Sequence, residues 1–130
     1  MSKIIIVSGP VIVKDSKVLL DIQGDDAFWK FCGGRVQEDE VLQETAARRA
    51  KEELGIDINI IDLKPFLFHI SKDSDGETHD IILAHFLSSF SGNIRIGNGV
   101  KEYRWFSREE LPSNLAPNIV PVLKHFGFIE

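Results

Sequence analysis

The sequence predicts an α/β fold, because segments with strand patterns alternate with segments that have helical spacing. Runs rich in β-branched residues cover Lys3 to Lys14, Val18 to Ile22 and His79 to Phe90. Apolar residues recur at helical spacing from Val41 to Leu54 and again from Asn118 to Phe126. With 130 residues, the chain is expected to form a single domain over 1–130 with a hydrophobic core.

The composition is ordinary for a soluble globular protein, with 43% apolar and 27% charged residues. The longest apolar runs fall far short of the roughly 20 residues that span a bilayer, and the N-terminus lacks the features of a secretory signal. We therefore expect a cytoplasmic protein without a membrane partner. The net charge of −5 argues against binding to a nucleic-acid backbone, which needs clustered Lys and Arg.

The first half of the chain is expected to begin with a β-hairpin. Its first strand, Lys3 to Lys14, should break at Gly9-Pro10, and after a turn the second strand is Val18 to Ile22. A short strand, Phe28 to Phe31, then leads into Gly33-Gly34. The single Cys32 excludes an internal disulfide. We interpret it as a buried structural thiol, with a reactive thiol as the alternative.

The second half is predicted to hold another hairpin. Ile56 to Ile61 and Leu63 to Ile70 have strand patterns, Ser71 to Thr78 is turn-like, and His79 to Phe90 returns. The three histidines of these strands are interpreted as core or surface residues, with substrate contact as the alternative: His69, His79 and His85. A strand at Lys101 to Phe106 and a short helix at Arg108 to Leu111, capped by Ser107, should precede the last helix.

The helix expected from Val41 to Leu54 has an apolar stripe beside a polar sector. The stripe consists of Leu42, Ala46, Ala47, Ala50 and Leu54, and the polar sector contains Arg49, Glu52 and Glu53. Asp39 is a plausible N-cap. Gly55 stands where a C-cap is expected.

Two carboxylates on one helix flank repel each other unless a cation joins them. Glu52 and Glu53 therefore indicate a possible site for Mg²⁺ or Mn²⁺, which prefer hard oxygen ligands. Gly33 and Gly34 allow backbone conformations that could turn a carbonyl toward the same ion. The alternative is a solvated helix face, on which Glu44 pairs with Arg48 and Arg48 pairs with Glu52 at i,i+4 spacing.

The spacing from Gly34 to Ile56 resembles the signature of the Nudix hydrolases, G-x5-E-x7-R-E-U-x-E-E-x-G-U, with U a bulky aliphatic. The six matching fixed positions are Gly34, Glu40, Arg48, Glu52, Glu53 and Gly55. The seventh differs, because Arg49 stands where the family has a glutamate. The resemblance implies a mixed β-sheet sandwiched between α-helices, with a loop-helix-loop catalytic box, and the segment from Glu102 to Pro112 extends it toward the C-terminus.

The resemblance also implies an activity and its residues. Nudix hydrolases mostly cleave a nucleoside diphosphate linked to another group, with divalent ions that here would be held by Glu52, Glu53 and the carbonyl of Gly33. Arg48 would orient a glutamate, and Glu40 would support the metal loop, with Gly34 and Gly55 as further support of the box. Arg49 opposes a second cation and could instead contact a substrate phosphate. Trp29 resembles an aromatic that the family often has before the glycine turn, although a core position is the alternative.

The GDP-mannose mannosyl hydrolases, a Nudix branch, provide a second and partial resemblance. They also carry a G-G-R-V-Q-x-D-E run and a Y-R-W strand, and they lack the same glutamate. Their loop histidine is missing here, because the loop consists of Asn98, Gly99, Val100 and Lys101. The family's later metal ligand is also missing, since Gly99 stands at its place. Glu102 is a candidate replacement base.

Two functions follow from these residues. One is a Mg²⁺- or Mn²⁺-dependent hydrolase acting on a small nucleotide, with nucleotide sugars and nucleoside triphosphates as leading substrates. The other is a catalytically weak nucleotide-binding module, which Arg49 and Gly99 favour. The family further suggests a homodimer.

Overall fold

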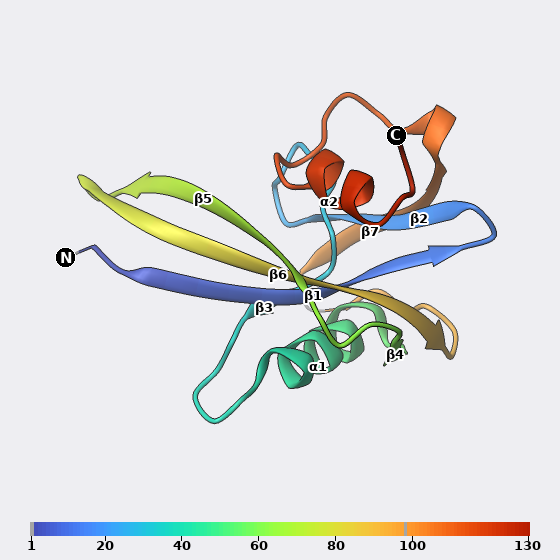
Figure 1. The fold of residues 1–130 in the computed structure, drawn as a ribbon, viewed down its shortest axis with the longest axis horizontal. Helices are drawn as coiled ribbons and strands as arrows, with labels where there is room; N and C mark the ends of the chain where they lie inside the picture. Colours follow the sequence, from blue (N-terminus) through green and yellow to red (C-terminus); the bar gives the residue numbers. More distant parts are fainter. Residues whose placement is uncertain (1, 98) are drawn as a thin grey trace.

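The computed structural model describes residues 2–97 and 99–130, and it has a mixed seven-stranded sheet between two helices (Figure 1). The elements in chain order are β1 (Ile4–Lys14), β2 (Lys17–Gln23), β3 (Gly34–Arg35), α1 (Leu42–Leu54), β4 (Asp57–Ile60), β5 (Phe66–Ser74), β6 (Glu77–Ser91), β7 (Val100–Ser107), the 3₁₀ turn η1 (Arg108–Glu110) and α2 (Ile119–His125). Helix α1 lies against one side of the sheet and α2 against the other. The predicted α/β sandwich is therefore confirmed.

Strand β1 is the centre of the sheet. It pairs in parallel with β6 over the whole stretch from Ile4 to Ile12. On its other edge, β1 pairs with β3 at Val7 and Ser8, and with β2 at Val13 and Lys14. Strand β2 then pairs with β7 in antiparallel fashion. The long strand β1 thus connects β3, which leads into the box, with the pair formed by β2 and β7.

The predicted break of the first strand at Gly9-Pro10 is wrong, since β1 runs through both residues. Pro10 has no N–H, but it falls between the β3 pairing and the β2 pairing on that edge of β1. The missing donor therefore removes no bond from either antiparallel ladder. Gly9 is needed for a different reason, because the chain at Cys32 and Gly33 crosses directly over it.

We expect Gly9→Ala to destabilise the fold by about 2 kcal/mol. A Cβ at Gly9 would overlap the carbonyl oxygen of Cys32 and lie 2.8 Å from the Cα of Gly33. Both are backbone atoms and cannot rotate away. Chemical denaturation measures the loss. Gly24→Ala is the matched control, because its Cβ would meet nothing within 4 Å and the left-handed φ of +53° costs only about 1 kcal/mol. Equal losses in the two variants would contradict the steric argument.

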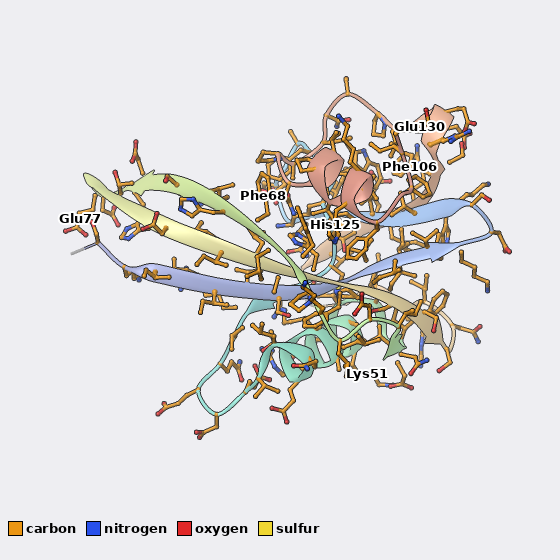
Figure 2. The ribbon with its side chains drawn as sticks, in the orientation of Figure 1. Lys51, Phe68, Glu77, Phe106, His125 and Glu130 are labelled. Carbon is orange, nitrogen blue, oxygen red and sulfur yellow. The ribbon has the colours of Figure 1, made fainter. Side chains whose placement is uncertain are left out.

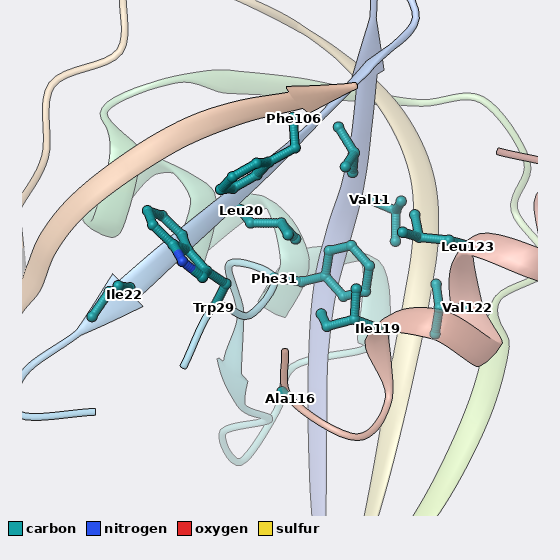
Figure 3. Packing of buried hydrophobic residues seen from close by; sticks show 11 residues of the cluster. Val11, Leu20, Ile22, Trp29, Phe31, Phe106, Ala116, Ile119, Val122 and Leu123 are labelled. Carbon is teal, nitrogen blue, oxygen red and sulfur yellow. The ribbon is translucent and has the colours of Figure 1, made fainter. Parts of the chain in front are cut away.

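Two apolar layers hold the helices to the sheet. The larger cluster packs α2 against β1, β2 and β7, and Figure 3 shows Trp29, Phe31 and Phe106 inside it. Trp29 and Phe106 meet edge to face with ring centroids 4.9 Å apart. On the other side of the sheet, Ala50 and Leu54 of α1 pack against a second cluster. The box helix is therefore fixed by its own apolar face.

The second hairpin is longer than the sequence indicated. Strands β5 and β6 continue through most of the predicted turn Ser71 to Thr78, and only Asp75 and Gly76 turn the chain. Both have positive φ, 55° and 76°, as a two-residue hairpin turn requires. Figure 2 shows Glu77 at the far tip of this arm, away from both helices.

Other predicted boundaries need small corrections. The predicted strand Phe28 to Phe31 forms only isolated bridges, at Trp29 and Lys30. Asp39 is not the N-cap of α1, since Val41 takes that position and its N–H donates to Glu44. Ala47 is exposed, because the face toward the sheet is formed by Thr45, Ala46, Ala50, Glu53 and Leu54. Gly55 is the C-cap as predicted, with a left-handed φ of 69°.

Among the described residues, no helix has the length and apolar character needed to cross a membrane.

Candidate active site

Glu40 organises the loop that leads into α1. Its carboxylate accepts hydrogen bonds from the Gln37 N–H at 3.0 Å, the Thr45 hydroxyl at 2.8 Å and Arg48 Nε at 2.6 Å. The bonds from Arg48 and from the Gln37 backbone lower the pKa of Glu40 to about 2. Glu40 therefore stays ionised and ties the loop to the helix, which supports its expected structural role.

Arg48 connects three segments of the box. Besides Glu40, its guanidinium donates to Glu52 Oε1 at 3.0 Å and to the backbone oxygen of Arg35 at 3.1 Å. The Arg48–Glu52 pair was also predicted for the alternative, a solvated helix face, so it does not distinguish the two interpretations. Glu44, by contrast, accepts from the Val41 N–H at 2.9 Å. Arg48 thus orients both Glu40 and Glu52.

Arg49 lies between the two carboxylates that were predicted to hold a metal ion. Its Nη1 is 3.3 Å from Glu52 Oε1, and its Nη2 is 2.6 Å from Glu53 Oε2. Glu53 is completely buried, although the sequence placed it on a polar sector. A Cβ at Gly34 would overlap the Arg49 side chain. The second glycine of the turn therefore makes room for this arginine.

The predicted ligand set of Gly33, Glu52 and Glu53 does not fit a divalent ion in this arrangement. The guanidinium of Arg49 stands between the two carboxylates, and its charge takes the place that a cation would need. Glu52 Oε1 also accepts from Arg48. Glu53 Oε1 accepts from Gln23 Nε2. Glu52 Oε1 and Glu53 Oε1 therefore already accept hydrogen bonds, and Glu53 Oε2 forms the ion pair with Arg49.

A second acidic cluster lies behind the glycine turn, and the sequence motifs did not reveal it. Single ligand atoms of Asp21, Cys32 and Glu53 all lie within 4.8 Å of one another, and all three residues are buried. Burial and the Glu53 charge raise the pKa of Asp21 to about 7, which Lys30 and Gln23 oppose. Burial, with Glu53 and Asp21 beside it, also raises the pKa of the Cys32 thiol. The sequence feature that could have indicated this cluster is Asp21, the single acidic residue in the apolar run Val18 to Ile22.

A cavity of about 860 Å³ opens beside these groups. Its lining includes the box residues Gly33, Gly34, Arg48 and Arg49. It also includes aromatic, apolar and polar side chains, namely Phe28, Lys30, Phe31, Ile81, Leu83, His85 and Asn118. Drug-sized ligands occupy pockets of roughly 300–1,000 Å³. The volume therefore accommodates a nucleotide.

His85 and Asn118 form a buried polar pair in the lining of the cavity. His85 Nδ1 is 3.1 Å from the Phe66 carbonyl oxygen, and its Nε2 is 2.9 Å from Asn118 Nδ2. A carbonyl only accepts, so Nδ1 carries the proton and Nε2 accepts from the Asn118 amide. Burial lowers the pKa of His85 to about 4. His85 is thus a neutral buried residue that also lines the cavity.

We expect the free energy of unfolding to fall by up to about 3 kcal/mol between pH 6.5 and pH 4 because of His85. In that range the unfolded chain binds a proton at this histidine that the folded chain does not bind. Denaturation at several pH values measures the fall, and His85→Gln should flatten the profile. Parallel profiles for the two proteins would contradict this assignment.

Two predicted site residues lie away from the cavity. Trp29 is 6% exposed and belongs to the core, so its predicted substrate contact is corrected to a packing role. The carboxylate of Glu102 is half exposed on β7, 4.0 Å from Arg104, and Glu102 is not among the described residues that line the cavity. This position does not support a role as base. In the loop before β7, Asn98 lies outside the described residues.

The family of the chain follows from comparison with known proteins. The sequence profile of the NUDIX domain matches residues 5–126. The chain belongs to the NUDIX family. Over 129 residues it is 30% identical to the CTP pyrophosphohydrolase of Escherichia coli K12, covering 95% of this chain and 92% of that protein. The match does not single out the mannosyl hydrolase branch.

Other similar proteins differ in their coverage. The solution structure of the E. coli ORF135 protein has a TM-score of 0.72 and 29% identity, and the match covers 97% of this chain and 90% of that one. The large ribosomal subunit protein mL46 of Neurospora crassa is 32% identical over 108 residues. That match covers 74% of this chain, which spans only 29% of the length of mL46. NUDIX similarity therefore extends to proteins named for different roles.

Proposed function

We propose that this NUDIX protein hydrolyses the phosphoanhydride bond of a nucleotide, releasing a nucleoside monophosphate. The observation that carries the proposal is the cavity of about 860 Å³, whose lining combines the box arginines with apolar, aromatic and polar side chains. A phosphate chain would lie against Arg48 and Arg49, and the nucleoside would extend toward His85 and Asn118. The similarity to a CTP pyrophosphohydrolase along nearly the whole chain supports the same reaction class.

The cavity lining offers groups for both parts of such a substrate. Arg49 lines the cavity and its side chain is about a quarter exposed, so the guanidinium can meet a phosphate oxygen. Asn118 also lines the cavity and donates to His85 through Nδ2. An amide oxygen accepts hydrogen bonds, so that of Asn118 is the group we assign to a base N–H. Nucleoside triphosphates and nucleotide sugars both satisfy this pattern.

A requirement for Mg²⁺ or Mn²⁺ is part of the proposal, since NUDIX proteins typically depend on divalent metals. Such an ion would neutralise phosphate oxygens when bound. Because Arg49 separates Glu52 from Glu53, the predicted ligand set does not supply its site as it stands. A cytoplasmic location and a homodimer remain predictions.

The test is to incubate the purified protein with nucleoside triphosphates, ADP-ribose and nucleotide sugars, with and without Mg²⁺ or Mn²⁺, and to identify products by mass. We expect a mononucleotide together with pyrophosphate or a sugar phosphate. A nucleoside diphosphate and free sugar would instead show cleavage at the sugar carbon, which contradicts the proposal.

A nucleotide-binding module is the second candidate, and the position of Arg49 favours it. An arginine that fills the space between Glu52 and Glu53 supplies charge to bind phosphate without a metal ion. In this case a nucleotide raises the melting temperature of the protein, and no member of the substrate panel is turned over with either metal. Thermal shift and product analysis on the same samples separate the two candidates.

A further inference from the structure

We propose that Asp21, Cys32 and Glu53 bind a divalent cation of the Zn²⁺ class, in a closed site behind the glycine turn. The site shares Glu53 with the NUDIX box but uses neither Glu52 nor the Gly33 carbonyl. It does not depend on the proposed hydrolysis, because metal binding is measured without a nucleotide.

The observation that points to a ligand is the state of Asp21. This residue is only 1% exposed, and neither of its carboxylate oxygens accepts a hydrogen bond of good geometry among residues 2–97 and 99–130, although Gln23 lies near enough to oppose the rise of its pKa. A buried carboxyl without donors loses the hydration it has in water, at a cost of several kcal/mol if it is charged. Its ligand oxygen faces the Cys32 sulfur and a Glu53 oxygen within 4.8 Å. A cation between them would give Asp21 the partner it lacks, and it would share Glu53 with Arg49 and Gln23.

The neighbouring cations leave this cluster with an excess of negative charge. Lys30 forms an ion pair with Asp26, in which the Lys30 Nζ lies 3.2 Å from the Asp26 carboxylate. Arg49 is divided between Glu52 and Glu53 and, within the described residues, forms no ion pair with Asp21. Within the described residues, Glu53 therefore shares the positive charge of Arg49 with Glu52, and no positively charged side chain forms an ion pair with Asp21.

The donor atoms indicate which ion would bind. One thiolate and two carboxylates suit Zn²⁺, with bonds of about 2.3 Å to sulfur and 2.0–2.2 Å to oxygen, whereas Mg²⁺ avoids sulfur. The ligand atoms of Asp21, Cys32 and Glu53 lie at most 4.8 Å apart. In an equilateral triangle with sides of that length, each atom is about 2.8 Å from the centre. Side-chain shifts of less than about 1 Å therefore close the site.

An ion has a route to the cluster. Cys32 lines the cavity together with Gln23, Gly33 and Arg49, so the cluster lies next to the cavity wall. Binding replaces the thiol proton and, where it is present, the Asp21 proton; both are released to solvent, and this release makes the affinity fall at low pH. The neighbouring Gln23 donates to Glu53 Oε1 and would turn away from that oxygen if the ion takes it.

The test is titration of the chelator-treated protein with Zn²⁺ by calorimetry, and with Co²⁺ as a spectroscopic probe. We expect one ion per chain and a thiolate-to-cobalt charge-transfer band in the near ultraviolet. Cys32→Ala should abolish the band, and Asp21→Asn should weaken Zn²⁺ binding at least about tenfold. The distant Glu102→Gln should change neither, Glu52→Gln should keep the cobalt band, and circular dichroism checks that each variant is folded.

Two results would overturn the proposal. The first is that folded wild-type protein binds neither ion, which would mean that Asp21 and Glu53 share a proton instead. The second is that binding survives in Cys32→Ala and Asp21→Asn but is lost in Glu52→Gln, which would return the ion to the box. Failure of nucleotide hydrolysis alone would leave the metal site intact, so the two proposals are tested separately.

Discussion

Replacing Glu53 by glutamine is expected to lower nucleotide turnover by at least about 100-fold. Glu53 is completely buried, and its carboxylate meets Arg49 at 2.6 Å and Gln23 at its other oxygen. It is also common to the predicted metal ligands and to the cluster with Asp21 and Cys32. Glutamine keeps the shape but loses the charge. Both the position of Arg49 and any cation beside Glu53 depend on that charge.

Steady-state kinetics on the best substrate of the panel measure the loss. Glu44→Gln is the matched control, since Glu44 lies on the same helix, is exposed and, among the described residues, accepts a hydrogen bond from the Val41 N–H alone. Its glutamine variant retains an acceptor for that bond and should keep full turnover. Melting temperatures show whether both variants remain folded. Full activity in folded Glu53→Gln protein would remove this carboxylate from the chemistry.

The sequence was informative where the determinants are local. The helix and its C-cap at Gly55 follow from residue spacing and from one left-handed glycine. The contacts among Glu40, Arg48 and Glu52 follow from the same spacing, because they lie within a single loop and helix. Local geometry fixes these relations, so residue spacing is sufficient to locate the box.

The remaining features depend on contacts between distant parts of the chain. Asp21, Cys32 and Glu53 come from β2, the glycine turn and α1, and no local pattern indicates that they meet. The fate of Trp29 was open for the same reason, since either a core or a cavity position suits an aromatic residue. Only the pairing of Trp29 with Phe106 of β7 decides it. The burial of Glu53 depends likewise on how α1 packs on the sheet.

Arg49 shows how a single substitution changes a site whose fold is retained. The arginine is accommodated because Gly34 has no side chain and because Glu52 and Glu53 pair with it. These neighbours belong to the box regardless of the residue at position 49. The arginine therefore costs the fold little, while it changes the charge that an incoming ion or phosphate meets.

Arg49→Glu is expected to raise the affinity for Mg²⁺ at the box by about 100-fold. The change removes the guanidinium between Glu52 and Glu53 and adds a carboxylate, so the charge facing the ion changes by two units. Two unit charges 4 Å apart interact by about 1 kcal/mol in water, and a change of two units facing a divalent ion multiplies this fourfold. Screening of the partly exposed side chains reduces the result to about 3 kcal/mol. If the arginine limits catalysis, turnover rises with the affinity.

Calorimetric titration with Mg²⁺ and kinetics on the same samples test this expectation. Lys51→Glu makes an equal charge change on the same helix, but Lys51 is exposed and pairs with Asp57 at 3.4 Å. It should leave the Mg²⁺ affinity nearly unchanged, which shows that position and not net charge is responsible. Tighter Mg²⁺ binding with lower turnover would mean that Arg49 itself holds a substrate phosphate. Unchanged Mg²⁺ affinity would contradict the inference that the guanidinium occupies the ion's place, because no other described cation lies between those two carboxylates.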